Sequence, residues 1–302
     1  MQVEHSVHNS APREPGSDAR SLKIREVSSL LGVPAPTIRS WERRHDLPAV
    51  SRDEQGHRRY TDDDVAILRR VRDQRALGMS ASAAAAAATA APPLVLCRQL
   101  LGAIHRLDGD AVTAVLDSSL EAHGLPATID EVLLPSMREV GVQWSRGECD
   151  VAQEHLATNT VLGWLSRRAA EAPPPLHDRP IVLSCGPQDQ HTISLEAFSL
   201  LLRQQRIDCR NLGAQTPATS LRHAVERCSA RAVVLVSQLG KNRPAAVAAL
   251  RGVAGSGATL FYAGAAFRTT ASRQKLPGQY LGGNLSRAAA QVADHLRQTS
   301  GR

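Results

Sequence analysis

The spacing of apolar residues changes character at about residue 172. From residue 94 to about residue 171, apolar positions such as Leu101, Ile104 and Val132 recur at helical intervals, which predicts a small helical bundle. Beyond three prolines, short apolar runs alternate with amphipathic helical stretches. The predicted strands are residues 181–183, 209–212, 232–236, 259–262 and 279–281. This alternation predicts a Rossmann-like, doubly wound parallel sheet, whose ligands bind beyond the carboxyl ends of the strands.

The first part of the chain contains shorter helical segments broken by glycine and proline. Residues 1–20 are polar and without pattern, so we expect a disordered arm. Segments 27–31 and 35–44 have helical spacing, and a longer helix is expected from Thr61 to about residue 76. The alanine run that follows favours helix but offers no apolar face for packing, which predicts a linker with helical tendency.

Together these patterns predict a multidomain chain that combines α and α/β parts. We expect a winged helix-turn-helix at residues 22–77, an Ala-rich linker at 78–93, a helical bundle at 94–172 and a Rossmann-like domain at 178–299.

Composition and charge narrow the function without deciding it. The formal net charge of +7 permits an anionic partner, but the excess is too moderate to identify a nucleic-acid binder. The five cysteines are widely spaced and form no C-x-x-C pair, which argues against a disulfide framework and against a zinc site. No apolar run approaches the roughly 20 residues of a membrane span, so we expect a cytoplasmic protein without a membrane partner.

Basic side chains gather on the second predicted helix and on a hairpin that follows it. A helix of this kind can place arginines against phosphates or guanine edges in the major groove, and a basic hairpin can grip the DNA backbone. The candidate DNA contacts are Thr37, Arg39, Arg43 and Arg44 on the helix and Arg52, His57, Arg58, Arg59 and Tyr60 on the hairpin. Either cluster alone is also typical of a solvated basic surface, so their order and spacing carry the DNA interpretation.

These segments resemble the MerR family of winged helix-turn-helix regulators. The resemblance rests on I-R-E-V at 24–27, T-I-R-S-W-E at 37–42 and G-H-R-R-Y at 56–60. It implies a recognition helix and a wing built from the candidate residues, and a homo-oligomer, dimer or tetramer, on palindromic double-stranded operator DNA. Trp41 is then expected in packing and Glu42 in a structural role.

A second group of candidates lies in the loops after the predicted strands. Asp189 and His191 follow the first strand, where a histidine can direct one ring nitrogen at a metal while the aspartate accepts the N–H of the other. An exposed loop histidine is the more common reading of such a residue taken alone. Three further segments, 212–217, 237–239 and 264–265, follow the later strands at the same edge.

Together these segments resemble the cobalamin-binding fold, whose signature is D-x-H-x-x-G, S-x-L and G-G in that order. The resemblance implies that His191 is the lower axial ligand of cobalt and that Asp189 holds its other ring nitrogen. It also implies that Ser237 and Leu239 line the slot for the nucleotide tail.

Two positions depart from that signature. Ser194 stands where the first segment has glycine, and Ala265 replaces the second glycine of the pair that begins at Gly264. Glycines there let the backbone approach the buried tail, so each added side chain threatens contact. We expect binding that is weakened rather than abolished.

In the helical bundle, Trp144 with the pair Glu154 and His155 resembles the cap that covers the upper face of the cofactor. The structural alternatives are a tryptophan in the bundle core and a solvated helix edge.

The domain order as a whole resembles the light-sensing, adenosylcobalamin-dependent MerR regulators known as CarH and LitR. This resemblance implies a non-enzymatic repressor that binds adenosylcobalamin, with light as a candidate signal that dissolves the oligomer. Ser145 stands where some members carry a second histidine able to ligate cobalt, so a light adduct through that position is excluded.

Two alternatives stay open from the sequence. A regulator of the same architecture that has lost cofactor binding is consistent with Ser194, Ala265 and Ser145. A cobalamin-dependent enzyme or methyl carrier would use the same two C-terminal modules, but no catalytic barrel accompanies them here.

Overall fold

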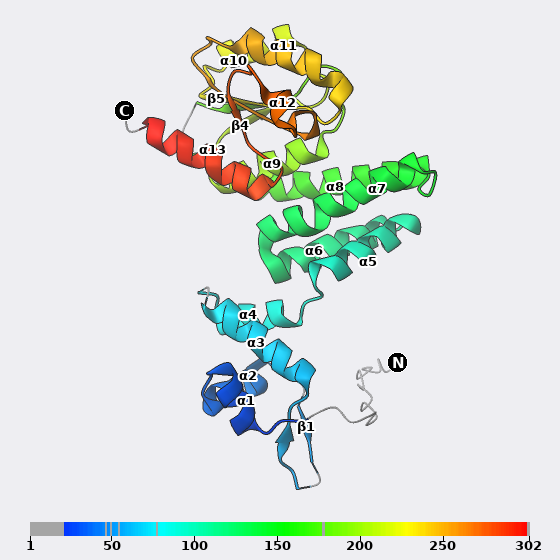
Figure 1. Ribbon diagram of the computed structural model, residues 1–302, viewed down its shortest axis with the longest axis vertical. Helices are drawn as coiled ribbons and strands as arrows, with labels where there is room; N and C mark the ends of the chain where they lie inside the picture. The colour runs from blue at the N-terminus through cyan, green and yellow to red at the C-terminus, as the bar shows by residue number, and fades with distance from the viewer. Residues whose placement is uncertain are drawn as a thin grey trace, which may run out of the picture. The chain divides into compact units, whose positions relative to one another are not determined.

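The structure, a computed structural model, describes residues 21–45, 47–48, 50–53, 55–76, 78–176 and 179–300. They divide into two units, one ending at Ala90 and one beginning at Ala91, and each is described by itself (Figure 1). The arm expected at residues 1–20 lies outside the described residues.

The first unit combines four described helices with a small antiparallel hairpin. The helices are α1 (Ile24–Leu31), α2 (Ala35–His45), α3 (Asp62–Ala76) and α4 (Ala81–Thr89), and the strands are β1 (Ser51–Arg52) and β2 (Arg58–Arg59). Gly32 ends α1 with a φ of 65°, a left-handed conformation that costs glycine little. Thr61 begins α3, because its hydroxyl accepts from the N–H of Asp64 while the Asp64 carboxylate accepts from the N–H of Thr61.

Residues from every helix of the first unit share one apolar core. Its buried members include Val27, Leu31, Ile38, Trp41, Tyr60, Val65, Leu68, Val71, Ala84 and Ala88. The helical spacing of the residues in α1 and α3 places them on one face of each helix.

The alanine run differs from the linker that the sequence predicts. Residues 81–89 form α4, whose N-terminus is capped by the Ser80 hydroxyl accepting from the N–H of Ala83. Ala84, Ala85 and Ala88 are buried, and α4 packs along α3. Alanine gives a helix face flat enough for close approach to a neighbouring helix, so α4 belongs to the first unit.

The second unit begins with the predicted helical bundle. Its elements are α5 (Pro93–His105), α6 (Gly109–Ala127), a π-helical turn η1 (Thr128–Leu133), α7 (Leu134–Ser145) and α8 (Val151–Ala170). Gly124 bends the end of α6 with a φ of 76°, which a larger residue would adopt only with strain. Its carbonyl accepts from the Thr128 hydroxyl, which also pairs with the buried Ser119 hydroxyl at 2.9 Å.

A five-stranded parallel sheet follows the bundle in the same unit. The strands are β3 (Ile181–Cys185), β4 (Cys209–Asn211), β5 (Ala232–Val236), β6 (Thr259–Ala263) and β7 (Gln279–Tyr280), in the spatial order β4-β3-β5-β6-β7. The helices between and after them are α9 (Ile193–Gln204), α10 (Ala218–Arg227), α11 (Arg243–Val253), α12 (Thr270–Arg273) and α13 (Leu285–Ser300), with short 3-10 turns η2 (Gly240–Asn242) and η3 (Ala265–Phe267). All five predicted strands are present, and the predicted fold class is confirmed.

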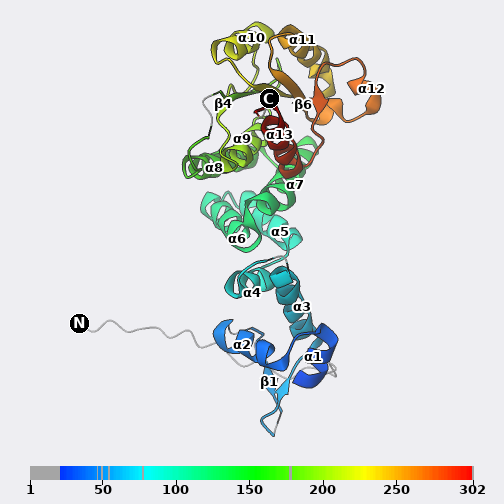
Figure 2. The ribbon, with the colours of Figure 1, turned by 90° about the vertical axis from the view of Figure 1, so that its left-hand side faces the viewer.

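Helices cover both faces of the sheet, and the bundle packs against one of these layers. Helices α9 and α13 lie between the sheet and the bundle, while α10 and α11 cover the opposite face (Figure 2). The carboxylate of Asp130, in η1, accepts from the N–H groups of Leu285 and Ser286 at 2.9 and 3.1 Å. This contact joins the bundle to the N-terminus of α13, where a negative charge is favourable.

No single helix among the described residues is long and apolar enough to cross a membrane, although the bent pair α4 and α5 passes by length and composition alone.

Candidate functional site

The outer face of α2 carries the first group of candidate residues. Ile38 and Trp41 are buried, so helical spacing turns the arginines at 39, 43 and 44 outward, and all three are exposed. Thr37 is half-buried at the start of the helix. The three guanidinium groups form a basic outer surface of the kind that binds phosphate or guanine.

The hairpin is tied to α2 through Glu42. Arg58 Nε donates to one carboxylate oxygen of Glu42 at 2.7 Å, and the Tyr60 hydroxyl donates to the other. Tyr60 is completely buried, and burial together with Glu42 raises the pKa of its hydroxyl. The prediction of Tyr60 as a direct DNA contact is therefore wrong for this conformation: its hydroxyl acts inside the unit and holds Glu42.

The hairpin tip is organised by Asp53. Its carboxylate accepts from the N–H groups of Gln55 and His57 and pairs with Arg59 at 3.0 Å, and the hydrogen bond from the His57 N–H is the main reason its pKa is lowered. Arg52 donates to the carbonyl of Gly56 and remains exposed, as does the side chain of His57. The tip thus presents Arg52 and His57 to an outside partner, while Arg58 and Arg59 are partly engaged by carboxylates.

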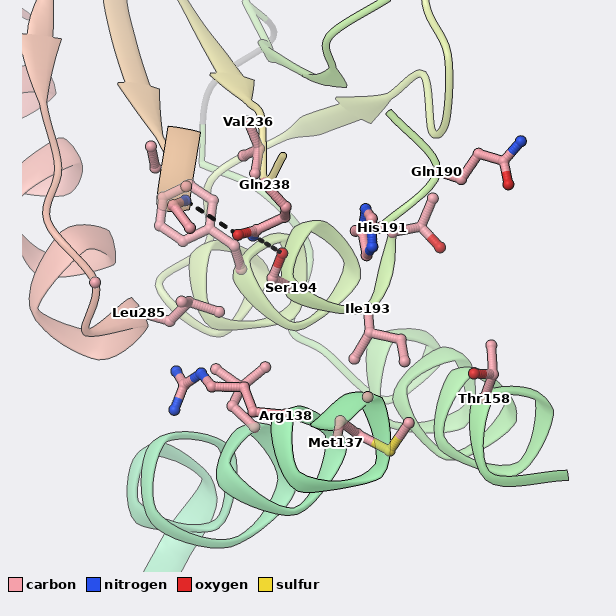
Figure 3. Close-up of a pocket in the computed structure, with 18 of the residues that line it drawn as sticks. Met137, Arg138, Thr158, Gln190, His191, Ile193, Ser194, Val236, Gln238 and Leu285 are labelled. Atoms are coloured by element: carbon pink, nitrogen blue, oxygen red, sulfur yellow. Dashed lines mark hydrogen bonds between the residues drawn. The ribbon is translucent and has the colours of Figure 1, made fainter. Parts of the chain in front are cut away.

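The second group of candidates surrounds a cavity of about 870 Å³ inside the second unit. One wall comes from α7 and α8, and the other comes from α9, the carboxyl ends of β5 and β6, and the start of α13 (Figure 3). Apolar side chains such as Met137, Ile193 and Val236 make up much of the lining. A pocket of this size, with a mainly apolar surface and polar side chains at defined places, is typical of a cofactor site.

Asp189 and His191 form a hydrogen-bonded pair at this cavity. The distance from His191 Nδ1 to Asp189 Oδ1 is 2.8 Å, and the His191 N–H donates to the same oxygen at 3.1 Å. His191 lines the cavity with a half-exposed side chain, whereas Asp189 is buried. With Nδ1 engaged, Nε2 is the nitrogen that an imidazole in this position offers to a metal.

The electrostatics of the pair follow from its hydrogen bonds. Burial acts to raise the pKa of Asp189, but hydrogen bonds from the His191 ring and from the backbone N–H groups of Gln238 and His191 outweigh burial and hold that pKa well below its usual range. The hydrogen bond with Asp189 raises the pKa of His191, and partial burial opposes this shift. Asp189 is thus a buried carboxylate that fixes the orientation of the ring.

Ser237 and Leu239 do not line the cavity, in contrast to the predicted slot. Ser237 is fully buried, and its hydroxyl donates to Asp189 Oδ2 at 3.2 Å. Leu239 is 38 % exposed and starts the turn after β5. Because the chain leaves the sheet at Val236, Ser237 points at Asp189 and Leu239 points to the surface.

Gly264 lies where two strand-end loops meet. Its φ is 104°, and a Cβ at this position would lie 2.1 Å from the carbonyl oxygen of Ser237. Only glycine fits such a close approach of two backbones.

The two residues that depart from the glycine signature are joined by Gln238. Gln238 Nε2 donates to the Ser194 hydroxyl at 3.1 Å, and Gln238 Oε1 accepts from the N–H of Ala265 at 3.1 Å. Figure 3 shows both hydrogen bonds. All three residues line the cavity, so a polar bridge crosses its edge.

The bundle residues expected in a cap also face the cavity. Trp144 lines it and is 54 % exposed, which excludes the alternative of a tryptophan in the bundle core. Glu154 and His155 line it too, and the Glu154 carboxylate accepts from the Thr158 hydroxyl at 2.7 Å. The structure thus brings the three bundle residues and His191 to one cavity from different elements.

Some cavity residues carried no signal in the sequence. Gln238 occupies the variable middle position of the S-x-L segment, and Arg138 and Arg268 add two exposed guanidinium groups to the lining. Their roles depend on which elements meet in space, which a pattern of single residues does not show.

Residues 22–90 match the family described as MerR HTH family regulatory protein, and residues 96–168 match the B12 binding domain. The chain is 32 % identical over 225 residues to the HTH-type transcriptional repressor CarH of Myxococcus xanthus, covering 68 % of this chain and 75 % of that protein. It is 33 % identical over 213 residues to the repressor CarA of the same organism, covering 68 % of this chain and 72 % of that protein.

Among solved structures, the monomethylamine corrinoid protein of Methanosarcina barkeri superposes with a TM-score of 0.53 at 12 % identity, covering 68 % of this chain and all of that one, a likeness of fold. The two family matches fall on the first unit and on the helical bundle of the second unit. The chain therefore belongs to the MerR-type transcriptional regulators that carry a cobalamin-binding domain.

Proposed function

We propose that this chain is a transcriptional repressor that binds operator DNA through its first unit and adenosylcobalamin through its second, with light as a second signal. The single observation that carries the proposal is the Asp189–His191 pair at a largely apolar cavity whose opposite wall presents Trp144. No catalytic activity is part of the proposal. A regulator needs only a change of binding energy between states.

The donor set of the second unit fits a corrinoid. His191 would ligate cobalt through Nε2, Asp189 would hold the ring, and Trp144, Glu154 and His155 would cover the opposite face. When bound, the corrinoid supplies a cobalt–carbon bond that light can break. The residues of this chain orient the imidazole and exclude water with apolar walls.

The first unit fits the backbone and major groove of DNA. Arg39, Arg43 and Arg44 lie together on the exposed face of α2, and Arg52 and His57 lie at the hairpin tip. Glu42 holds Arg58 and thereby sets the position of the hairpin relative to α2. We propose that the protein acts on a palindromic operator as a homo-oligomer, because two-fold sites match paired recognition helices.

Cofactor binding is tested by whether the protein retains adenosylcobalamin after desalting. The protein is mixed with adenosylcobalamin in darkness and desalted, and its absorption spectrum is recorded before and after illumination. Wild type should retain the corrinoid and change its spectrum in light, whereas His191→Ala should lose the cobalt–imidazole bond and bind more weakly. His223→Ala, at an exposed histidine on α10, is the matched control. Equal retention and identical spectra for wild type and His191→Ala would contradict the assignment.

The DNA half is tested with double-stranded fragments selected from a random pool. Arg39→Ala should weaken binding and lower the salt dependence by about one counterion if the residue contacts a phosphate. Arg251→Ala, at an exposed arginine on α11 of the second unit, is the control. Unchanged affinity and salt slope in Arg39→Ala, Arg43→Ala and Arg44→Ala would reject α2 as the recognition helix.

A regulator that works without a cofactor is the second candidate. The hydrogen bonds of Gln238 to Ser194 and to Ala265 favour a cofactor-independent regulator. Ser194 and Ala265 carry side chains where the signature has glycine, and Gln238 links these two positions. The retention experiment separates the two: a wild-type protein that loses all corrinoid on desalting while still binding its selected DNA supports this second candidate.

A further inference from the structure

Basic side chains are unevenly distributed over the second unit. Residues 227–293 contain nine arginines and lysines and no aspartate or glutamate. The whole chain is far more evenly mixed, with 36 basic and 29 acidic residues. A basic side chain in this segment therefore has no carboxylate nearby along the chain that could neutralise it.

Five of these nine basic residues come together at the carboxyl edge of the sheet. Turn η2 follows β5, turn η3 follows β6, and the two turns contact each other. Helix α12 packs against η3, and Figure 2 shows it at an outer edge of the second unit. We call the basic residues in and beside these elements the basic corner: Lys241, Arg243, Arg268, Arg273 and Lys275.

Two arginines of the basic corner hold its elements in place. Nε and Nη2 of Arg243 donate to the carbonyl of Ser272 at 2.9 and 2.7 Å, which ties the start of α11 to α12. The guanidinium carbon of Arg273 lies 4.6 Å from the ring centroid of Tyr280, so this cation stacks on an aromatic face. The backbone that carries the other basic side chains is thereby fixed.

The other three charges of the basic corner are available to an outside partner. The side chains of Lys241, Arg268 and Lys275 are exposed, and among the described residues none of the three has an ion-pair or hydrogen-bond partner. Unneutralised cations on a fixed scaffold suit a polyanion such as DNA, because each phosphate that they contact releases a condensed counterion.

The helical bundle of a second copy is the other anionic surface to consider. Residues 94–171 contain eleven acidic and six basic residues. Seven of the eleven carboxylates already accept hydrogen bonds within the second unit: Asp108, Asp117, Asp130, Glu139, Asp150, Glu154 and Glu171. Since most of the negative charge of the bundle is already engaged, DNA complements the basic corner better.

We propose that the basic corner is a second DNA-binding surface, which contacts phosphates of the duplex that the first unit binds. This inference rests on the proposed binding of DNA by the first unit and adds a contact from the second. Because both units belong to one chain, DNA bound by the first unit is present at a high effective concentration for the second. Phosphate contacts carry no direct sequence information, so the basic corner adds affinity and salt dependence and leaves the choice of operator unchanged.

The test is a salt titration of DNA binding by the full chain with adenosylcobalamin in darkness. Dissociation constants for the selected double-stranded fragment are measured by fluorescence anisotropy between about 50 and 200 mM salt. The proteins are wild type, the double variant Lys241→Gln/Lys275→Gln, and a triple variant that adds Arg268→Gln. The matched control is Arg98→Gln/Arg167→Gln, which removes two charges at exposed arginines on α5 and α8. Sedimentation velocity without DNA reports the self-association of each protein.

The slope of the logarithm of affinity against the logarithm of salt concentration is the decisive quantity. The double variant should reduce this slope by about 1.8 and the triple variant by about 2.7, so the double variant's loss of affinity is about twelve-fold larger at about 50 mM salt than at about 200 mM. Slopes equal to that of wild type in both variants, or an equal reduction in the control, would overturn the basic corner as a DNA surface while leaving the proposed function intact.

Two further outcomes are also decisive. Weaker self-association of the double variant in the absence of DNA would assign the basic corner to a second copy of the chain and would likewise overturn the proposal. If wild type binds no DNA at any salt concentration, the proposed function itself is wrong.

Discussion

Asp189 accepts four hydrogen bonds, and its replacement by asparagine tests how the site is held. Oδ1 accepts from the N–H and the ring of His191, and Oδ2 accepts from the Ser237 hydroxyl at 3.2 Å and the Gln238 N–H at 2.6 Å. An asparagine that keeps its oxygen toward His191 turns its NH₂ toward the other two donors. The Ser237 hydroxyl can rotate and accept, but the Gln238 N–H cannot.

The expected loss of stability comes from the Gln238 N–H, which has no acceptor when asparagine replaces Asp189. A hydrogen bond to a charged group contributes about 1.5–3 kcal/mol, and a buried donor left unpaired costs about 1–3 kcal/mol. These values describe overlapping effects, so we expect Asp189→Asn to reduce the free energy of unfolding by about 2–4 kcal/mol. Asp189 is 1 % exposed, so solvent screens little of this loss. A domain of ordinary stability, about 5–15 kcal/mol, remains folded.

The assay is urea unfolding of wild type, Asp189→Asn and the control Asp294→Asn, whose carboxylate is exposed on α13. Far-ultraviolet circular dichroism gives the midpoints. In the folded variant, the affinity for adenosylcobalamin should fall by about ten- to one-hundred-fold, the usual effect of losing the residue that orients a metal-binding histidine. If Asp189→Asn had the same stability and the same corrinoid affinity as Asp294→Asn, Asp189 would not hold the site through these hydrogen bonds.

Three further changes probe other contacts. Asp130→Ala removes two hydrogen bonds at the start of α13 and should lower the stability of the second unit by about 1–2 kcal/mol in urea unfolding. Asp130→Asn keeps one acceptor and should be intermediate. Equal unfolding midpoints for wild type and both variants would contradict the contact. Ala88→Asp places an unpaired charge at a fully buried position and should destabilise the first unit by about 3 kcal/mol or more, measured by its thermal unfolding, whereas a freely solvated linker would tolerate it. Tyr60→Phe removes the hydrogen bond to Glu42 and should cost the first unit about 1.5–3 kcal/mol; a loss of operator affinity without any loss of stability would instead indicate direct contact with DNA.

The elements with a strong repeating pattern were predictable from the sequence. The central strands β3 and β5 are buried, largely apolar runs because both faces of the sheet are covered there, and the bundle helices show the spacing of a buried stripe. The pairing of His191 with Asp189 is predictable because the two residues are close in sequence and follow a strand, whereas their role toward cobalt is implied only by the resemblance. Their hydrogen bond confirms the pairing expected from that separation.

The sequence does not show the role of a residue whose partner lies far away along the chain. The alanine run lacks large apolar side chains, yet α4 packs closely because methyl groups suffice against α3. Tyr60 looks like a wing residue in sequence, but Glu42, 18 positions away, draws its hydroxyl inward. The S-x-L resemblance places Ser237 in the slot for the nucleotide tail, whereas the fold brings Asp189, 48 positions away in sequence, against its hydroxyl.

The two positions of the G-G pair have different structural requirements, and Gly264 meets the stricter one. The first position must be glycine because the carbonyl of Ser237 occupies the place of a Cβ, and this holds with or without a ligand. The second position carries the methyl group of Ala265 at an exposed turn, and the fold accommodates it. In a survey of related chains, glycine at the first position would therefore report that two loops meet. A small residue other than glycine at the second position would leave that contact between the loops intact.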